Sequence, residues 1–328
     1  MPVLLIMRSM YERYAEEIAA MDGGDRVEPV FVPEPGERLS PAEMDRIEIA
    51  TPPIPEEDAP GSRRFYGTAT RAPNLRWVHL PHVGIDDDVF GQFLDGGVRL
   101  TNVSGAMSEP IAWSAIAGLL QLARGFPHWA EAQRRREWMP QPSGQEPTDL
   151  RGQTAVVFGL GAIGSEIARL AQALRLHVIG VRRSPQRPDD PVDELVAPSA
   201  LAEVLPRADW LILAAPLTAQ TRGLIDRSAL DLLPVGARIV NIARGQIIDE
   251  PSMIQRLEDG RLGGAYLDVF AEEPLPSSSP LWSLPNVIVT PHNSEAVSHA
   301  ERRLDGYFLR NLQHWLREEP LENEVSER

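Results

Sequence analysis

The sequence predicts an α/β protein of two domains, the larger one built on a doubly wound parallel sheet. Its 328 residues suit about two domains of ordinary size. From residue 154 onward, short apolar runs alternate with helical patterns, which is typical of parallel strands covered by helices on both faces. The chain also opens on a β-α-β pattern, which places a further α/β unit before that sheet.

The first part of the chain is predicted to hold short strands among proline-rich segments. We expect strands at residues 3–7, 27–32, 77–80 and 98–101, a helix at 11–21, proline-rich segments at 33–41 and 52–60, and turns at 82–88. A long apolar helix is expected at 111–125. Residues 126–150 then combine charged residues, prolines and Trp138, so we expect an extended arm that serves as a linker or an interface.

The second part of the chain is more regular. Strands are expected at residues 154–158, 177–181, 210–214, 238–242, 264–268 and 287–290, and helices at 165–174, 199–205, 227–233 and 250–259. A last helical pattern at 301–318 has no strand after it, so we expect it to pack on the first domain.

The composition excludes several kinds of chemistry. The chain has no cysteine, which rules out thiol nucleophiles, disulfides and Cys-ligated metals. It has no lysine either, which rules out Schiff-base catalysis and the phosphate lysines of P-loop and kinase sites. A net charge of −15 disfavours nucleic acid and anionic membranes as partners.

The remaining compositional signals predict an ordinary intracellular protein. No run approaches the roughly 18 apolar residues of a membrane span, and residues 3–7 are too few for a signal-peptide core, so we expect a cytoplasmic location. The histidines show no metal-ligand spacing, and we expect no metal site. The acidic cluster of Asp189, Asp190, Asp193 and Glu194 is expected to be a solvated loop.

The residues from Gly159 to Gly164 read G-x-G-x-x-G directly after a buried strand and before a helix. Gly159 permits a tight turn, Gly161 lets the backbone approach a pyrophosphate, and Gly164 lets helix and strand pack closely. The helix N-terminus faces the anion. The sequence therefore predicts a Rossmann-type dinucleotide site.

The end of the next strand carries Arg182, Arg183 and Ser184, where an NAD site usually has a carboxylate for the ribose hydroxyls. Two guanidiniums and a hydroxyl can hold a 2′-phosphate through charge-assisted hydrogen bonds. NADP is therefore favoured and NAD is possible, since Arg182 can also stack on the adenine without selecting a phosphate.

Three polar residues follow predicted strands at the edge of the sheet where open α/β folds bind ligands: Arg244, Glu273 and His292. Arg244 can grip a substrate carboxylate and polarise the neighbouring carbonyl. His292 can donate a proton to the developing alkoxide, and Glu273 can hold the imidazolium. Together they suffice for the reduction of a carbonyl group.

Five ordered segments together resemble the D-isomer-specific 2-hydroxyacid dehydrogenase family. They are GLGAIG at 159–164, APLTAQTRGLI at 215–225, NIARG at 241–245, DVFAEEPLP at 268–276 and TPH at 290–292. The resemblance covers the whole chain and implies that Arg244, Glu273 and His292 are the catalytic set. Motif and resemblance together imply these cofactor residues: Gly159, Leu160, Gly161, Ala162, Ile163, Gly164, Ala215, Pro216, Thr221, Ile242, Ala243 and Asp268.

The resemblance also implies the domain roles. Residues 1–101 with 293–328 would form a smaller flavodoxin-like substrate domain, and 102–292 a dinucleotide-binding domain, with hinges near Thr101 and His292 and a cleft between the domains. His82, Val83 and Gly84 lie in the loop implied to bind the substrate carboxylate. His82 replaces a residue that is often small, and it either shapes the pocket or caps a turn. The arm at 126–150 matches a dimer-forming extension, so a homodimer is implied.

We therefore expect an oxidoreductase that transfers a hydride between NAD(P)H, with NADPH favoured, and a small 2-oxo acid to give a D-2-hydroxy acid. Two alternatives are a dinucleotide-sensing dimeric scaffold without turnover and an oxidoreductase for an inorganic anion such as phosphite. The sequence does not identify the 2-oxo acid or the physiological direction.

Overall fold

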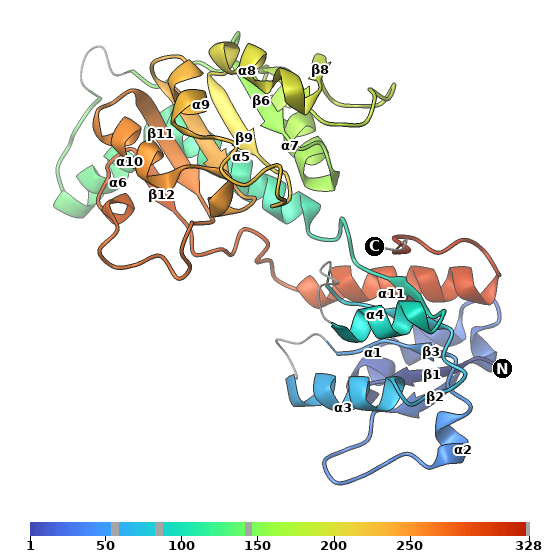
Figure 1. Cartoon of the computed structure of the whole chain (residues 1–328). Helices are drawn as coiled ribbons and strands as arrows, with labels where there is room; N and C mark the ends of the chain where they lie inside the picture. The colour runs from blue at the N-terminus through green and yellow to red at the C-terminus, as the bar shows by residue number, and fades with distance from the viewer. Residues whose placement is uncertain (54–58, 83–87, 142–145, 326–328) are drawn as a thin grey trace. The chain divides into compact units, whose positions relative to one another are not determined.

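The computed structural model describes residues 1–53, 59–82, 88–141 and 146–325. The chain splits into two compact units, Met1–Ala106 with Ser298–Arg328 and Met107–Val297. We expected boundaries after residues 101 and 292, a few positions earlier in the same loops. Each unit has a parallel sheet with helices on it, which confirms the predicted α/β fold class (Figure 1).

The first unit contains a five-stranded parallel sheet in the order β2-β1-β3-β4-β5, a flavodoxin-like order. Its strands are β1 (Val3–Ile6), β2 (Glu28–Phe31), β3 (Ile49–Ala50), β4 (Trp77–His79) and β5 (Arg99–Thr101). Its helices are α1 (Arg8–Ala19), α2 (Pro41–Met44), α3 (Ala59–Ala69), α4 (Asp88–Asp95) and α11 (Ala300–Leu316). The C-terminal helix therefore belongs to this unit, as we expected.

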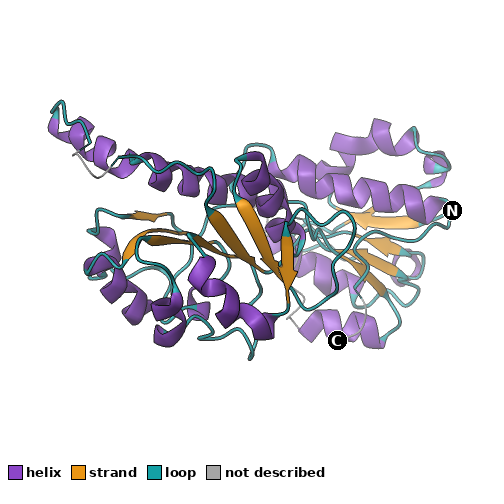
Figure 2. Ribbon diagram, turned by 90° about the horizontal axis from the view of Figure 1, so that it is seen from above, coloured by secondary structure: helices purple, strands orange, loops and turns teal. Residues whose placement is uncertain are grey.

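Helices cover both faces of the first sheet because its side chains alternate between the faces. Leu4 and Trp77 belong to a core cluster with α1 and with Phe308 of α11. Leu5 and Val78 belong to a second cluster, on α3 and α4. Figure 2 shows helices in purple on both sides of the orange strands.

Four helices and strands of the first unit were not predicted: β3, α2, α3 and α4. The two residues of β3 are too few to show a period. Helix α3 begins within the proline-rich segment, where Pro60 is tolerated because the first helical turn has no partner for its missing N–H. Phe65 is fully buried, so tertiary packing outweighs the weak helix propensity of this segment.

The second unit contains a seven-stranded parallel sheet in the order β12-β11-β10-β9-β6-β7-β8. Its strands are β6 (Thr154–Phe158), β7 (His177–Val181), β8 (Glu194–Val196), β9 (Trp210–Leu213), β10 (Ala237–Asn241), β11 (Leu262–Leu267) and β12 (Val287–Val289). Its helices include α5 (Ser108–Arg124), α6 (Phe126–Arg135), α7 (Ala162–Ala173), α8 (Leu201–Val204), α9 (Arg227–Leu232) and α10 (Glu250–Glu258). Helices α5 and α7 cover one face, and α8, α9 and α10 cover the other.

The arm at residues 126–150 is not extended throughout, because residues 126–135 form helix α6. Gly125 adopts a left-handed conformation that ends α5, and Pro127 suits the first turn of the new helix. Phe126 and Trp138 remain exposed, with Trp138 at 97% of its full accessibility. An exposed apolar set on a projecting segment is typical of an interface.

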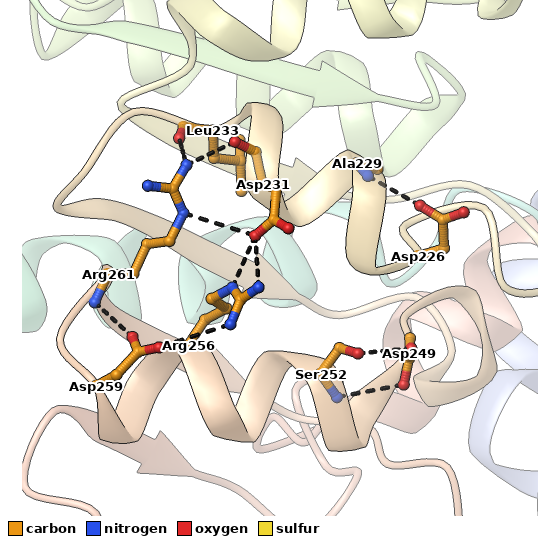
Figure 3. A network of polar contacts seen from close by, with 9 residues as sticks. All are labelled: Asp226, Ala229, Asp231, Leu233, Asp249, Ser252, Arg256, Asp259 and Arg261. Atoms are coloured by element: carbon orange, nitrogen blue, oxygen red, sulfur yellow. Dashed lines mark hydrogen bonds and ion pairs between the residues drawn. The ribbon is translucent and has the colours of Figure 1, made fainter.

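A polar network ties α9 to α10 beside the strands that carry the predicted site (Figure 3). The buried Arg256 donates to Asp231 at 2.7 Å, and Arg261 donates to the carbonyl oxygens of Asp231 and Leu233. Asp249 caps α10 by accepting from the backbone N–H of Ser252. The loop that joins β10 to α10 is thus anchored at its distal end.

A buried histidine lies at the end of β4. The Nδ1 of His79 is 2.8 Å from the hydroxyl of Thr101, and its Nε2 has no partner among the described residues. Burial, with a smaller contribution from Arg310, lowers the pKa of His79 to about 3. The imidazole is therefore neutral in the folded protein at neutral pH.

This burial predicts an acid-sensitive first unit. Between pH 6.5 and about 3 the unfolded chain binds a proton at His79 that the folded chain does not, so stability falls as the pH falls. The expected slope from this group is about 1.4 kcal/mol per pH unit. Denaturant unfolding of the wild type and of His79→Asn at pH 7, 6, 5 and 4 measures it. If the free energy of unfolding changed equally with pH in the two proteins, His79 would not be the source of the acid sensitivity.

No helix within the described residues has the length and the apolar character needed to span a bilayer.

Candidate active site

The glycine turn has the geometry that the motif requires. A Cβ added to Gly164 would lie 1.8 Å from the carbonyl oxygen of Gly159, so only glycine permits this close packing of helix and strand. Gly159 itself has φ +100° and packs against the backbone of Ala215. At Gly161 an added Cβ would meet nothing within 4 Å. The turn therefore leaves open space at the N-terminus of α7, where a pyrophosphate fits.

The other predicted cofactor residues surround this turn or follow neighbouring strands. Leu160 is buried against Gly180, whereas Ala162 and Ile163 open α7. The hydroxyl of Thr221 donates to the carbonyl oxygen of Pro216 at 2.8 Å, which closes the loop after β9. Ile242 and Ala243 are buried directly after β10, and Asp268 is fully buried after β11.

The structure divides the roles of the three residues after β7. The guanidinium of Arg182 forms a two-pronged ion pair with Asp190, with Nη1–Oδ1 at 2.9 Å and Nη2–Oδ2 at 2.6 Å. The side chains of Arg183 and Ser184 are exposed and bond to no other residue in the described part of the chain. The guanidinium of Arg182 is thus occupied by contacts within the protein, whereas the side chains of Arg183 and Ser184 are free to bind a ligand.

The acidic cluster is exposed at Asp189 and Asp193, as expected of a solvated loop, but not at Asp190. Asp190 is only 6% exposed because it pairs with Arg182. Asp193 accepts the backbone N–H of Val178 at 2.7 Å, and Glu194 begins β8. Charge complementarity with the preceding arginines was the available signal for this pairing.

The three predicted catalytic residues follow the adjacent strands β10, β11 and β12. The Nδ1 of His292 lies 2.6 Å from Oε2 of Glu273. The other carboxylate oxygen of Glu273 accepts the backbone N–H of Phe270 at 2.9 Å, which fixes its orientation. Both side chains remain partly exposed, at 43% for His292 and 33% for Glu273, so the pair is accessible to a ligand.

Arg244 lies on the turn beside the Glu273 loop. A Cβ on Gly245 would lie 1.9 Å from the carbonyl carbon of Phe270, so the turn after β10 and the loop after β11 are in direct backbone contact. The side chain of Asn241 holds the turn from within, since it accepts from the N–H of Ala243 and donates to the carbonyl oxygen of Arg244. The Arg244 side chain is exposed.

A buried carboxylate shapes the backbone that carries His292. Asp268 accepts hydrogen bonds from the hydroxyl of Thr290 at 2.6 Å and from the backbone N–H groups of Asn293 and Ser294 at 3.1 Å each. Its own carbonyl oxygen accepts the N–H of His292 at 2.8 Å. His292 is held at φ +51°, a left-handed conformation that costs energy in most residues. Strain of this kind is often found at functional positions.

A tyrosine extends this network into the core. The hydroxyl of Tyr266 lies 3.1 Å from that of Thr290, and burial raises the pKa of Tyr266. Sequence reasoning did not single out Tyr266, Thr290 or Asn241. The last two lie inside segments used for the resemblance, so their motifs were the available signal.

The predicted substrate loop belongs to the first unit. The ring of His82 lies 5.5 Å from that of Phe90, between centroids. Val83 and Gly84 fall outside the described residues.

In chemical terms, the second unit combines a dinucleotide turn with an imidazole–carboxylate pair and a guanidinium at the same edge of one sheet. The imidazole can give or take a proton, and the guanidinium can bind a carboxylate. A bound nicotinamide would add a hydride donor or acceptor. The arrangement suits the interconversion of a carbonyl and an alcohol next to a carboxylate.

Comparisons with known proteins agree with this chemistry. The model of the "D-isomer specific 2-hydroxyacid dehydrogenase, NAD binding domain" matches residues 116–294. A D-3-phosphoglycerate dehydrogenase of Methanocaldococcus jannaschii is 31% identical over 87% of this chain, which spans 56% of that relative's length. A glyoxylate reductase of Pyrococcus furiosus is 35% identical over 74% of this chain and 73% of its own.

A solved structure extends the similarity to the whole chain. The D-isomer specific 2-hydroxyacid dehydrogenase of Xanthobacter autotrophicus Py2, in complex with NADPH and MES, superposes with a TM-score of 0.72 at 27% identity. The match covers 99% of this chain and 98% of that one, so both units have counterparts there.

Proposed function

Because the chain belongs to the D-isomer specific 2-hydroxyacid dehydrogenase family, we propose that it reduces a small 2-oxo acid to the D-2-hydroxy acid with NADPH. The family resemblance expected from the five segments is thus confirmed, and the cofactor is a nicotinamide dinucleotide. The contact that best supports the proposal is the 2.6 Å pair of His292 and Glu273 beside Arg244.

In the proposed reaction, Arg244 binds the substrate carboxylate and draws electron density from the adjacent carbonyl. A nicotinamide dinucleotide held at the glycine turn would supply the hydride that the carbonyl carbon accepts. His292 contacts Glu273 through Nδ1, so Nε2 is the nitrogen that gives a proton to the carbonyl oxygen. Glu273 stabilises the charged imidazole before that transfer, and the reverse steps oxidise the hydroxy acid.

A spectrophotometric panel tests the proposal. Glyoxylate, hydroxypyruvate, phenylpyruvate and branched 2-oxo acids are offered with NADPH and NADH in parallel. We expect at least one to oxidise NADPH and to give the D-hydroxy acid on chiral chromatography. Tight cofactor binding without any turnover would instead favour a sensing scaffold, and reduction of NADP⁺ by phosphite would favour an anion oxidoreductase.

The exposed Arg183 and Ser184 after β7 support the proposed preference for NADPH. We expect Arg183→Ala to raise the KM for NADPH about tenfold or more, the equivalent of one hydrogen bond to a charged group. The KM for NADH is the internal control and should not change, because NADH has no 2′-phosphate. An equal rise for both cofactors would contradict the role given to Arg183.

We also propose that the protein forms a homodimer through the arm. Three exposed aromatic residues lie in or just after α6: Phe126, Trp129 and Trp138. The exposed Trp282 lines the same groove as Phe126. Light scattering on the purified protein should give twice the chain mass. A single chain mass at micromolar concentration would refute the dimer.

A further inference from the structure

The loop between β7 and β8 is closed by one carboxylate. Asp190 holds Arg182 at the start of the loop through two hydrogen bonds of 2.9 and 2.6 Å. Its Oδ2 also accepts the backbone N–H of Arg187 at 2.6 Å. These bonds lower the pKa of Asp190, with the bond from Arg182 as the main cause. The carboxylate is therefore charged and fully engaged at neutral pH.

The guanidinium of Arg182 binds the loop as well as the carboxylate. Its Nη2 donates to the carbonyl oxygen of Pro185 at 2.6 Å, and its Nε donates to that of Ser184 at 3.3 Å. Arg182 and Asp190 are 12% and 6% exposed, so the pair forms the interior of the loop. We call this buried pair, with its bonds to residues 184, 185 and 187, the clasp.

The clasp leaves a different set of side chains on the outside. Arg183, Ser184 and Arg187 are exposed, and their side chains bond to nothing else that the structure describes. Because the charge of Asp190 is balanced by Arg182, Arg183 and Arg187 present two guanidiniums on the outside of the loop, together with the exposed carboxylate of Asp189. The guanidinium of Arg183 and the adjacent hydroxyl of Ser184 are groups that suit a phosphate.

The loop starts beside the dinucleotide turn. Val181 pairs with Phe158, and the N–H of Gly159 donates to the carbonyl oxygen of Val181 at 3.0 Å. In a sheet of this topology the adenosine ribose lies at the end of the strand that follows the glycine-turn helix. That strand is β7, so the outer residues of the loop stand where a ribose 2′-phosphate would be.

We propose that Asp190 is a specificity-determining positioning residue, which through the clasp holds Arg183 and Ser184 in place to bind the 2′-phosphate of NADPH. The inference rests on the proposed use of NADPH. It reverses the simple electrostatic expectation, in which a carboxylate near the 2′-phosphate repels it and its removal strengthens binding. Here the removal of Asp190 releases Arg182 and the backbone at residue 187, and the phosphate site loses its shape.

The test compares Asp190→Asn with Asp189→Asn, which removes the same charge one residue away. Asp189 is exposed and has no hydrogen bond or ion pair with the described residues. Calorimetry measures the Kd of 2′,5′-ADP and of 5′-AMP for each protein. We expect Asp190→Asn to raise the Kd of 2′,5′-ADP about tenfold, as for a lost hydrogen bond to a charged group, with 5′-AMP unchanged. Asp189→Asn should match the wild type.

Three outcomes would overturn the inference: unchanged or tighter binding of 2′,5′-ADP by Asp190→Asn, an equal loss of 5′-AMP, or an equal effect in Asp189→Asn. Asp190→Ala provides a second variant in which no side-chain amide can replace the bond to Arg182. Retained 5′-AMP binding verifies that the variants are folded.

This assay is independent of the proposed reaction. If no 2-oxo acid is turned over but Asp190→Asn selectively loses 2′,5′-ADP, the proposed reaction fails and the clasp stands. If wild-type protein does not prefer 2′,5′-ADP to 5′-AMP, the NADPH preference fails and the clasp fails with it. If turnover with NADPH is found and the variants bind normally, only the clasp fails.

Discussion

Replacing His292 with asparagine is expected to lower kcat for 2-oxo acid reduction by about a hundredfold to ten-thousandfold, the usual range for a general acid. The variant loses the only imidazole paired with Glu273 in the described structure, at 2.6 Å, and water must then supply the proton. Stopped-flow kinetics measure the rate of NADPH oxidation, and a separate titration measures the Kd of the cofactor. Together they distinguish an effect on the chemical step from an effect on cofactor binding.

Asparagine is the sharper substitution because of the backbone at this position. His292 has φ +51°, and asparagine tolerates the left-handed region better than alanine does. The hydrogen bonds of Asp268 to the turn are then expected to remain. Glu273→Gln should show a smaller loss of kcat with an unchanged cofactor Kd. A kcat for His292→Asn within threefold of the wild type would remove His292 from the catalytic set.

Replacing Arg244 with alanine is expected to lower kcat/KM by about a thousandfold, because two hydrogen bonds to a charged carboxylate are lost. KM should rise and kcat should fall together, since the guanidinium both binds the carboxylate and polarises the carbonyl. The exposed position of the side chain makes a folding defect minor.

Arg244→Lys provides the matched control. It keeps the positive charge and loses the planar fork that grips both carboxylate oxygens. We expect it to recover part of the KM effect and little of the kcat effect. Steady-state kinetics with the best 2-oxo acid measure both. Wild-type kinetics in Arg244→Lys would mean that charge alone suffices and that the fork has no role.

The site was largely predictable because its residues follow strands directly. Gly159 to Gly164 follow β6, and Arg244, Glu273 and His292 follow β10, β11 and β12, so a correct sequence of strands is enough to place them at one edge. The 2.6 Å contact between Glu273 and His292 follows from the adjacency of β11 and β12. The short apolar runs of these strands stand out in the sequence, which explains why the edge that carries these residues could be predicted.

The rest depended on packing that a linear pattern does not contain. The pairing of Arg182 with Asp190 requires the loop to fold back on itself, and the sequence alone allowed Arg182 to face a ligand instead. Helix α3 forms because Phe65 is buried, against weak local propensity. The left-handed backbone of His292 results from the bonds of Asp268, which no single-residue preference predicts.

The return of α11 to the first unit sets the order in which the chain can fold on the ribosome. Residues 107–297 are contiguous, so the second unit is fully synthesised while the first still lacks Phe308 and Leu312, which complete its core. On one face of the nascent sheet, the cluster of Leu4 and Trp77 therefore has only the early part of its cover, from α1, until nearly the whole chain has emerged. The unit that is synthesised first is thus the last to be completed. Its incomplete apolar face is exposed to chaperones and to aggregation during translation.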